Sequence, residues 1–189
     1  MKIAVIGGTF NPIHAGHLFL CEEVRLQYNY ERIIFIPANL PVHKELTDRI
    51  DPLHRLEMVK IATAPYADFV VDDCELSRGG NSYMIETMTD IIRRYSPKGK
   101  PGLIIGDDLA KDFFSWKDAH RLSEMVDLII AHRLTASEGS IDFPCKYVDN
   151  LLFSISSTEI RQRIKEGRAV SSMLPDKVLS YIKQQSLYK

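Results

Sequence analysis

Residues 2–18, KIAVIGGTFNPIHAGHL, hold the change of pattern that decides the fold. Residues 2–6 are almost wholly apolar, which is typical of a buried strand, and a helical pattern follows over residues 16–29. Between the two lie a pair of glycines, a proline and two histidines three positions apart. The stretch therefore predicts a strand, a turn and a helix, and the turn carries the side chains of chemical interest.

The same alternation of strand and helix continues along the chain. Several apolar runs are continuous rather than alternating, as in strands buried on both faces of a parallel sheet. The pattern predicts an α/β protein with a single Rossmann-like open parallel sheet, right-handed crossovers and helices on both faces. The expected strands cover residues 2–6, 32–37, 68–73, 102–106, 126–132 and 145–149.

Two of the expected helices have clear start signals. Asp51 is a candidate N-cap and is followed by Pro52, a residue favoured in the first helical position. Ser156 and Glu159 have the spacing of a capping box. The expected helices cover residues 16–29, 52–64, 82–95, 156–166 and 175–185.

The composition is that of an ordinary globular protein. The 189 residues suffice for one domain, which we expect to cover residues 1–189 with a C-terminal helical part at about 156–187. A hydrophobic content of 45% and a net charge of −1 argue against disorder and against nucleic-acid binding driven by bulk charge. We expect no membrane span, no signal peptide, and three reduced cysteines in a cytoplasmic protein.

The turn after the first strand is the natural place for a ligand, since open α/β sheets bind ligands beyond the carboxyl ends of their strands. Gly7 and Gly8 allow close approach of the backbone, and the following helix start can hold an anion. His14 and His17 share one helical face, where two converging donors suit a phosphate. The alternatives are a zinc site, for which further ligands are lacking nearby, and a purely structural role in capping the helix.

A second group of phosphate-binding residues is expected near the carboxyl end, in ISSTEIR at residues 155–161. Its hydroxyl side chains crowd a helix N-terminus, where hydroxyls and free amides can hold phosphate oxygens. Arg161 lies one turn further on and offers a forked, permanently charged group. Taken alone, the segment could also be an ordinary capped helix with a surface arginine.

Together these two segments resemble a known pair of motifs. GTFNPIHAGHL at residues 8–18 resembles the HxGH signature of the nucleotidyltransferase superfamily, and ISSTEIR resembles the ISxTxIR motif that accompanies it. The resemblance implies transfer of AMP from ATP to a phosphate acceptor without a covalent intermediate, with Mg²⁺ bridging the ATP phosphates and no dedicated metal site. It assigns catalysis to His14, His17 and Arg161. It assigns ATP binding to these three and to Gly7, Gly8, Thr9, Phe10, Gly106, Ile155, Ser156 and Thr158.

Three intermediate segments indicate the acceptor. PANLPVHK at 37–44, ELSRGGNSYMIETM at 75–88 and LIIGDDLAKDFFSW at 103–116 resemble segments of bacterial nicotinate-nucleotide adenylyltransferases. The resemblance implies nicotinate mononucleotide as the acceptor, with deamido-NAD and pyrophosphate as products of NAD biosynthesis. It implies an acceptor site made of Asn39, His43, Lys44, Tyr83, Met84, Asp108, Trp116 and Arg133.

Within this set, Asp108 is a candidate ribose ligand, and Trp116 would stack on the pyridine ring unless it is an ordinary core residue. Met84 departs from the family pattern SYT, in which a threonine is associated with the nicotinate carboxylate, so selectivity for acid over amide depends on whether a backbone amide does the binding. The alternatives are a pantetheine-phosphate adenylyltransferase and a non-catalytic nucleotide-binding domain. A homo-oligomer is possible, and nucleic acid and membranes are not expected partners.

Overall fold

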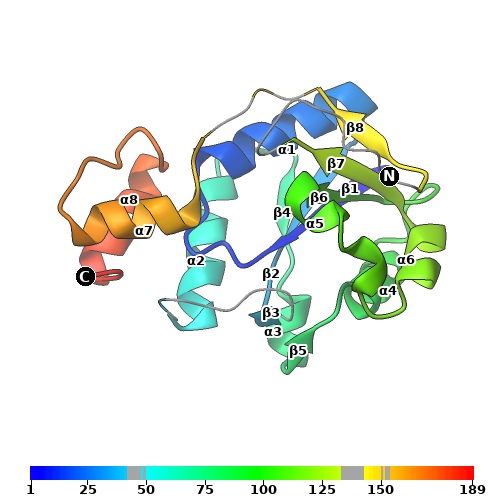
Figure 1. Ribbon diagram of the computed structural model, residues 1–189, viewed down its shortest axis with the longest axis horizontal. Coiled ribbons are helices and arrows are strands. Elements are labelled where there is room, and N and C mark those ends of the chain that lie inside the picture. The colour runs from blue at the N-terminus through cyan, green and yellow to red at the C-terminus, as the bar shows by residue number, and fades with distance from the viewer. Residues whose placement is uncertain (42–47, 49, 133–142, 150, 152–153) are drawn as a thin grey trace.

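A parallel sheet forms the centre of the molecule (Figure 1). The computed structural model describes residues 1–41, 48, 50–132, 143–149, 151 and 154–189. Within these residues the strands of the main sheet run in the order β4-β2-β1-β6-β7-β8, and every neighbouring pair is parallel. These strands are β1 (Ile3–Gly8), β2 (Arg32–Pro37), β4 (Phe69–Val71), β6 (Gly102–Gly106), β7 (Asp127–Ala131) and β8 (Lys146–Val148).

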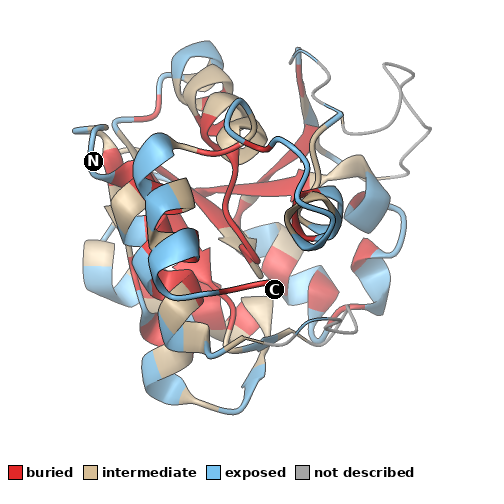
Figure 2. Cartoon of the chain, turned by 90° about the vertical axis from the view of Figure 1, so that its left-hand side faces the viewer, coloured by how far each residue is buried: buried red, intermediate tan, exposed pale blue. Residues whose placement is uncertain are grey.

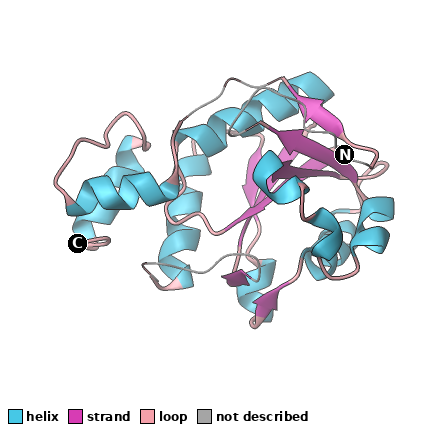
Figure 3. Ribbon diagram, in the orientation of Figure 1, coloured by secondary structure: helices cyan, strands magenta, loops and turns pink. Residues whose placement is uncertain are grey.

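Helices flank this sheet on both sides, and the predicted fold class is confirmed (Figure 3). None of the helices in the described part of the chain combines the length and the apolar character that a bilayer crossing requires. A two-stranded parallel sheet of β3 (Leu40–Pro41) and β5 (Asn81–Ser82) lies apart from the main one. The helices are α1 (Ala15–Tyr28), α2 (Pro52–Thr63), α3 (Cys74–Arg78), α4 (Met84–Tyr95), α5 (Asp107–Ala110), α6 (Ala119–Met125), α7 (Ser157–Lys165) and α8 (Asp176–Gln184), with a 3₁₀ turn at Phe113–Ser115.

The two faces of the sheet bury two separate apolar clusters, and the buried strands are red in Figure 2. Ala4 and Ile6 of β1 point to the cluster that contains α1, α2, α7 and α8. Ile3 and Val5 point to the opposite cluster, which contains α4 and α6. Because successive side chains of a strand alternate between faces, a strand buried on both faces must be apolar at every position.

Both predicted helix starts are present. The Asp51 carboxylate accepts a hydrogen bond from the backbone N–H of Leu53 at 2.8 Å, with Pro52 in the first helical position of α2. The Ser156 hydroxyl accepts from the backbone N–H of Glu159 at 3.1 Å at the start of α7. These caps satisfy amides that the helices themselves leave without an acceptor.

Two predicted boundaries near the candidate site were wrong. The helix expected over residues 82–95 begins at Met84, because Ser82 pairs with Pro41 in the small sheet as part of β5. The other error is at the end of β1. Gly7 and Gly8 are the last residues of β1 rather than part of the turn, and they pair with Ile36 and Pro37 of β2. Glycine has little intrinsic preference for a strand, so the apolar pattern ends at Ile6, but pairing with a neighbouring strand carries β1 two residues further. The turn therefore begins at residue 9.

Candidate active site

Residues 9–14 connect the end of β1 to α1 at the carboxyl edge of the sheet. Phe10 adopts a left-handed backbone conformation with φ of 47°, and its side chain is buried. A Cβ atom on Gly8 would lie 3.1 Å from this ring, so Gly8 leaves the space that Phe10 occupies. The Phe10 ring also packs edge-on against His17 at 5.2 Å. The segment is thus held in shape by its own apolar side chain.

The two histidines meet at the start of α1, as their spacing predicts. Their ring centroids are 3.7 Å apart, with His14 buried and His17 half-buried. The backbone N–H of His14 donates to Nδ1 of His17 at 3.2 Å. Because Nδ1 acts as an acceptor, the proton of the neutral His17 ring resides on Nε2, which is the donor of that ring.

The second predicted motif packs directly on this turn. Arg161 is 6% exposed, and its Nη1 donates to the backbone carbonyl of Asn11 at 2.9 Å. The hydroxyl of Ser157 donates to the carbonyl of Pro12 at 2.9 Å. Thr158 is exposed one turn before Arg161, with its Oγ1 3.5 Å from Nη2 of that arginine. The fold therefore brings together two segments about 145 to 150 residues apart in the chain.

An acidic residue that sequence reasoning missed faces this arginine. Oδ2 of Asp48 lies 3.2 Å from Nε of Arg161, and Oδ1 accepts a hydrogen bond from Lys165. The hydrogen bonds from Lys165 and from Arg161 hold the pKa of the Asp48 carboxyl below its usual range. The carboxylate thus contacts two cations of α7, Arg161 and Lys165. No sequence signal separates Asp48 from other surface acids.

Three predicted acceptor residues lie in two segments. Asn39 lies two residues after the end of β2, and Tyr83 and Met84 lie at the start of α4. Asn39 donates from its backbone N–H to the hydroxyl of Ser82 at 2.9 Å and from Nδ2 to the carbonyl of Gly80 at 2.9 Å. Tyr83 is the N-cap residue of α4, and Met84 is the first residue of that helix. The Met84 methyl lies only 2.6 Å from the position that a Cβ atom on Gly7 would take.

The remaining predicted residues follow β6. Gly106 ends that strand and Asp108 is exposed on α5. Trp116 is 9% exposed and packs against Phe113 at 5.4 Å between ring centroids, as a core residue would. Its stacking on a pyridine ring stays a prediction. His43, Lys44 and Arg133 lie outside the described residues, and Ile155 and Ser156 lead into α7.

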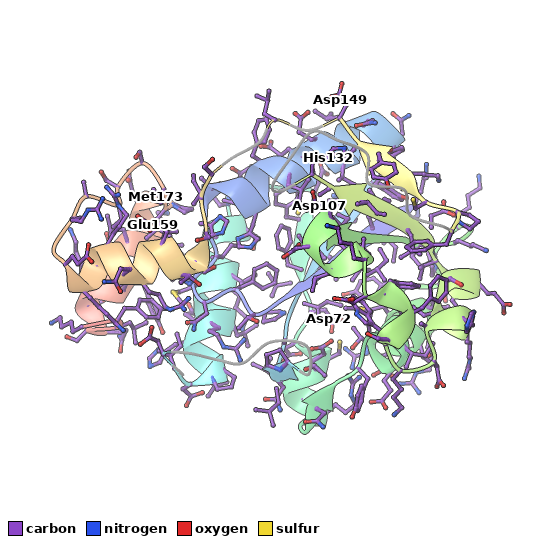
Figure 4. The ribbon with its side chains drawn as sticks, viewed as in Figure 1. Asp72, Asp107, His132, Asp149, Glu159 and Met173 are labelled. Carbon is purple, nitrogen blue, oxygen red and sulfur yellow. The ribbon has the colours of Figure 1, made fainter. Side chains whose placement is uncertain are left out.

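Asp107 and His132, both labelled in Figure 4, extend the same edge of the sheet. They directly follow Gly106 and Ala131, which are paired residues of β6 and β7. Across the described ranges no group of three or more His, Cys, Asp or Glu side chains is arranged to hold a metal ion. The edge thus presents histidine, carboxylate and arginine groups that come from separate elements.

Two further residues support the turn and were not predicted. Arg55 of α2 donates from Nη1 to the carbonyl of Thr9 at 2.7 Å and from Nη2 to the carbonyl of Asn39 at 3.2 Å. The hydroxyl of Tyr188 donates to Oδ1 of Asn11 at 2.7 Å. A signal for Arg55 exists, because it begins the i, i+3, i+4, i+7 series of buried positions 55, 58, 59 and 62 in α2. Tyr188 carries no comparable signal.

Comparison of the sequence with known proteins shows the family to which the chain belongs. The cytidylyltransferase-like family model matches residues 5–163, which include the histidine turn and Arg161. A protein from Borreliella afzelii named "Probable nicotinate-nucleotide adenylyltransferase" is 42% identical over 188 residues, covering 100% of this chain and 97% of its own. A protein of the same name from Citrifermentans bemidjiense is 36% identical over 213 residues, covering 100% and 98%. The chain therefore belongs to the cytidylyltransferase-like family and, within it, to the nicotinate-nucleotide adenylyltransferases.

Solved structures agree on the fold. The Plasmodium falciparum nicotinic acid mononucleotide adenylyltransferase, solved in complex with NaAD, has a TM-score of 0.73 and 20% sequence identity to this chain. The match covers 99% of this chain and 97% of that one. The same Plasmodium protein complexed with APC gives a TM-score of 0.73 at 19% identity. The arrangement of strands and helices is thus shared where the sequences have largely diverged.

Proposed function

We propose that this protein transfers the AMP moiety of ATP to nicotinate mononucleotide. A phosphate oxygen of the mononucleotide attacks the α-phosphorus of ATP, and the bond from that phosphorus to the oxygen bridging to the β-phosphate breaks. Pyrophosphate leaves and deamido-NAD forms. Because the acceptor phosphate is itself the nucleophile, no side chain needs to form a covalent intermediate. The protein accelerates the reaction by positioning the two substrates and stabilising the developing negative charge.

One observation carries this proposal, namely the docking of the start of α7 on the histidine turn. The contacts Arg161 to Asn11 and Ser157 to Pro12 put an arginine, a helix N-terminus and the His14–His17 pair around one short segment. The positive end of a helix and a forked cation both favour bound phosphate. A triphosphate is the ligand that uses all of these groups together.

His17 is the group that we expect at the transition state. Its hydrogen bond from the His14 backbone fixes the ring orientation and keeps the proton on Nε2. A donor that is already oriented stabilises charge on the α-phosphate without reorganising during the reaction. His14 packs against this ring and is expected to contact the phosphates from the same side.

Arg161 is expected to bind the β- and γ-phosphates, and it would exchange one anionic partner for another on doing so. In the present structure its Nε faces the Asp48 carboxylate. Arrival of a triphosphate supplies more negative charge than a single carboxylate, so the phosphates would displace Asp48 from Arg161 and Lys165. The cost of that exchange reduces the affinity for ATP.

Mg²⁺ is expected to enter with ATP, held by phosphate oxygens and water. The groups that carry the candidate site, His17, Arg161 and Lys165, are donors and cations, which suit phosphate oxygens better than a bare metal ion. Mg²⁺ commonly binds through substrate phosphates and retains several waters, so this donor set fits a phosphate-bound ion. When bound, the ion would neutralise charge on the triphosphate.

The acceptor would lie between the end of β2 and the start of α4. Asn39 offers its side-chain oxygen, and the first-turn amides of α4 around Met84 offer donors for the nicotinate carboxylate. Asp108 would accept hydrogen bonds from a ribose hydroxyl. If backbone amides bind the carboxylate, methionine in place of threonine at position 84 preserves the preference for acid over amide. His43, Lys44 and Arg133 remain expected partners of the acceptor.

The test measures pyrophosphate release from MgATP with three acceptors side by side: nicotinate mononucleotide, nicotinamide mononucleotide and phosphopantetheine. A strong preference for the nicotinate form is expected. Equal use of both pyridine nucleotides would retain the chemistry and refute the acid selectivity. Activity with phosphopantetheine alone would refute the acceptor, and no release with any of the three would refute catalysis. The His17→Ala variant controls for contaminating ATP hydrolysis.

A further inference from the structure

Arg55 is a buried cation whose hydrogen-bond acceptors in the described residues are neutral backbone carbonyls. Its side chain is 1% exposed and is among the largest that the protein buries fully. Within the part of the chain that the structure describes, its hydrogen bonds go to two backbone carbonyls, those of Thr9 and Asn39, and not to a carboxylate. Burial lowers the pKa of the guanidinium below its usual range.

This arrangement is costly if the side chain only fills space. Moving a charge from water into the interior is strongly unfavourable, and two carbonyl dipoles offset this less well than a carboxylate would. A methionine or leucine at this position of α2 would fill a similar volume without that cost. The retained charge therefore points to a task that an apolar side chain cannot perform.

The two carbonyls belong to different loops of the candidate site. Thr9 directly follows β1 and begins the segment that leads to His14. Asn39 follows β2 and is itself hydrogen-bonded to Gly80 and Ser82, in the segment that leads to α4. In the sheet, the last register pair before the loops diverge is Gly8 with Pro37. Arg55 thus joins the loops just beyond the point where strand pairing ends.

We propose that Arg55 is a positioning residue that fixes the distance between the loop expected to bind ATP and the loop expected to bind the acceptor. The inference rests on the proposed function, in which an acceptor phosphate must meet the α-phosphorus in line. The planar guanidinium suits this task, because its two terminal nitrogens donate in fixed and separate directions. Arg55 touches neither substrate in this scheme and acts through the two loops.

The experiment compares Arg55→Met and Arg55→Lys with the wild type. Methionine retains much of the volume, and lysine retains the charge but offers one nitrogen in place of two. Arg94→Met is the control, because Arg94 lies on the last turn of α4, outside both loops, and its side chain pairs with the buried carboxylate of Asp72 at 3.0 Å. Each variant is characterised by its Tm, by kcat, by the KM of each substrate and by the Kd of each substrate alone.

Misplacement of reacting groups by about 1 Å can cost a factor of about 100 in rate. We therefore expect Arg55→Met to lower kcat by about 100-fold, while the Kd of each substrate alone changes no more than a few-fold. Arg55→Lys is expected to fall between Arg55→Met and the wild type. Arg94→Met is expected to lower Tm and leave kcat unchanged, which separates lost stability from lost positioning.

A folded Arg55→Met protein with wild-type kcat and KM values, measured below its Tm, would overturn the proposal. If Arg55→Met fails to fold, Arg55→Lys decides the question, and a wild-type kcat in that variant would overturn the positioning role. All rates are measured with the acceptor that the wild-type protein uses best. A wrong assignment of the acceptor would therefore be visible in the wild type and would leave the comparison of Arg55 variants intact.

Discussion

The contact between Gly7 and Met84 can be tested by a double-mutant cycle. A Cβ atom on Gly7 would lie 2.6 Å from the Met84 methyl, well inside the 3.4 Å at which ordinary contact begins. Gly7 is absent from the glycines with positive φ, so alanine fits its backbone conformation. The only obstacle to Gly7→Ala that the structure presents in the described residues is thus the end of one flexible side chain.

Two opposing effects determine how much Gly7→Ala changes the free energy of unfolding. Overpacking costs about 1 kcal/mol when a flexible methionine can move aside. Replacing glycine by alanine at a compatible site stabilises by about 0.4–1 kcal/mol through the unfolded chain. In the wild-type background Gly7→Ala should therefore change the free energy of unfolding very little. In the Met84→Ala background only the favourable effect remains, so the two substitutions should couple by about 1 kcal/mol.

Urea unfolding of the wild type, both single variants and the double variant measures this coupling. For a domain of this size, about 1 kcal/mol corresponds to about 2–4 °C in Tm, which thermal unfolding would resolve. Additivity within about 0.3 kcal/mol would refute the reasoning, because it would mean that the two side chains do not compete for space. The KM of nicotinate mononucleotide should rise in Gly7→Ala, where the methyl is displaced, and recover in the double variant.

Three further predictions concern the turn and its neighbours. His17→Ala should lower kcat for pyrophosphate release by about 100- to 1000-fold with a nearly unchanged Tm, and an unchanged kcat would contradict the role of this donor. Asp48→Asn should lower the KM of ATP, because Arg161 no longer needs to exchange a carboxylate for phosphate; the effect should weaken at high salt. Because hydrogen bonds from Lys165 and Arg161 keep the pKa of Asp48 below its usual range, the difference should persist at neutral pH and vanish only in acid, where the wild-type carboxyl is protonated too. Tyr188→Phe should lower the free energy of unfolding by about 1 kcal/mol, measured in urea, since Asn11 loses a buried hydrogen bond; equal stability would show that water replaces the hydroxyl.

Strands β1, β2, β6 and β7 were predictable because each is a largely apolar run of five or six residues, whereas β4 and β8 span three residues each. The starts of α2 and α7 were predictable because Asp51 and Ser156 are local signals. Short elements such as α3, α5 and the β3–β5 pair span too few residues to show a period. The end of β1 at Gly8 was missed because its support comes from β2 rather than from its own side chains.

The candidate site was only partly predictable from the sequence. The histidine pair was found from spacing, because His14 and His17 are neighbours on one helical turn. The contacts of Arg161 with Asp48 and Asn11 were not found, because they join residues more than 100 positions apart and leave no local pattern. Sequence reasoning thus named the groups that we expect to bear the chemistry and missed the groups that hold them in place.

The anchoring of residues 9–12 has a consequence for the order of events in folding. Its partners Ser157, Arg161 and Tyr188 come 145, 150 and 177 residues later in the chain. Closing such long loops is entropically costly, so we expect these contacts to form after those between strands that are close in the chain. Residues 9–12 are therefore among the first that the ribosome makes, and we expect them to be among the last that reach their final conformation. We therefore expect activity to appear only when folding is complete, and a form with an intact sheet but without these contacts to be inactive.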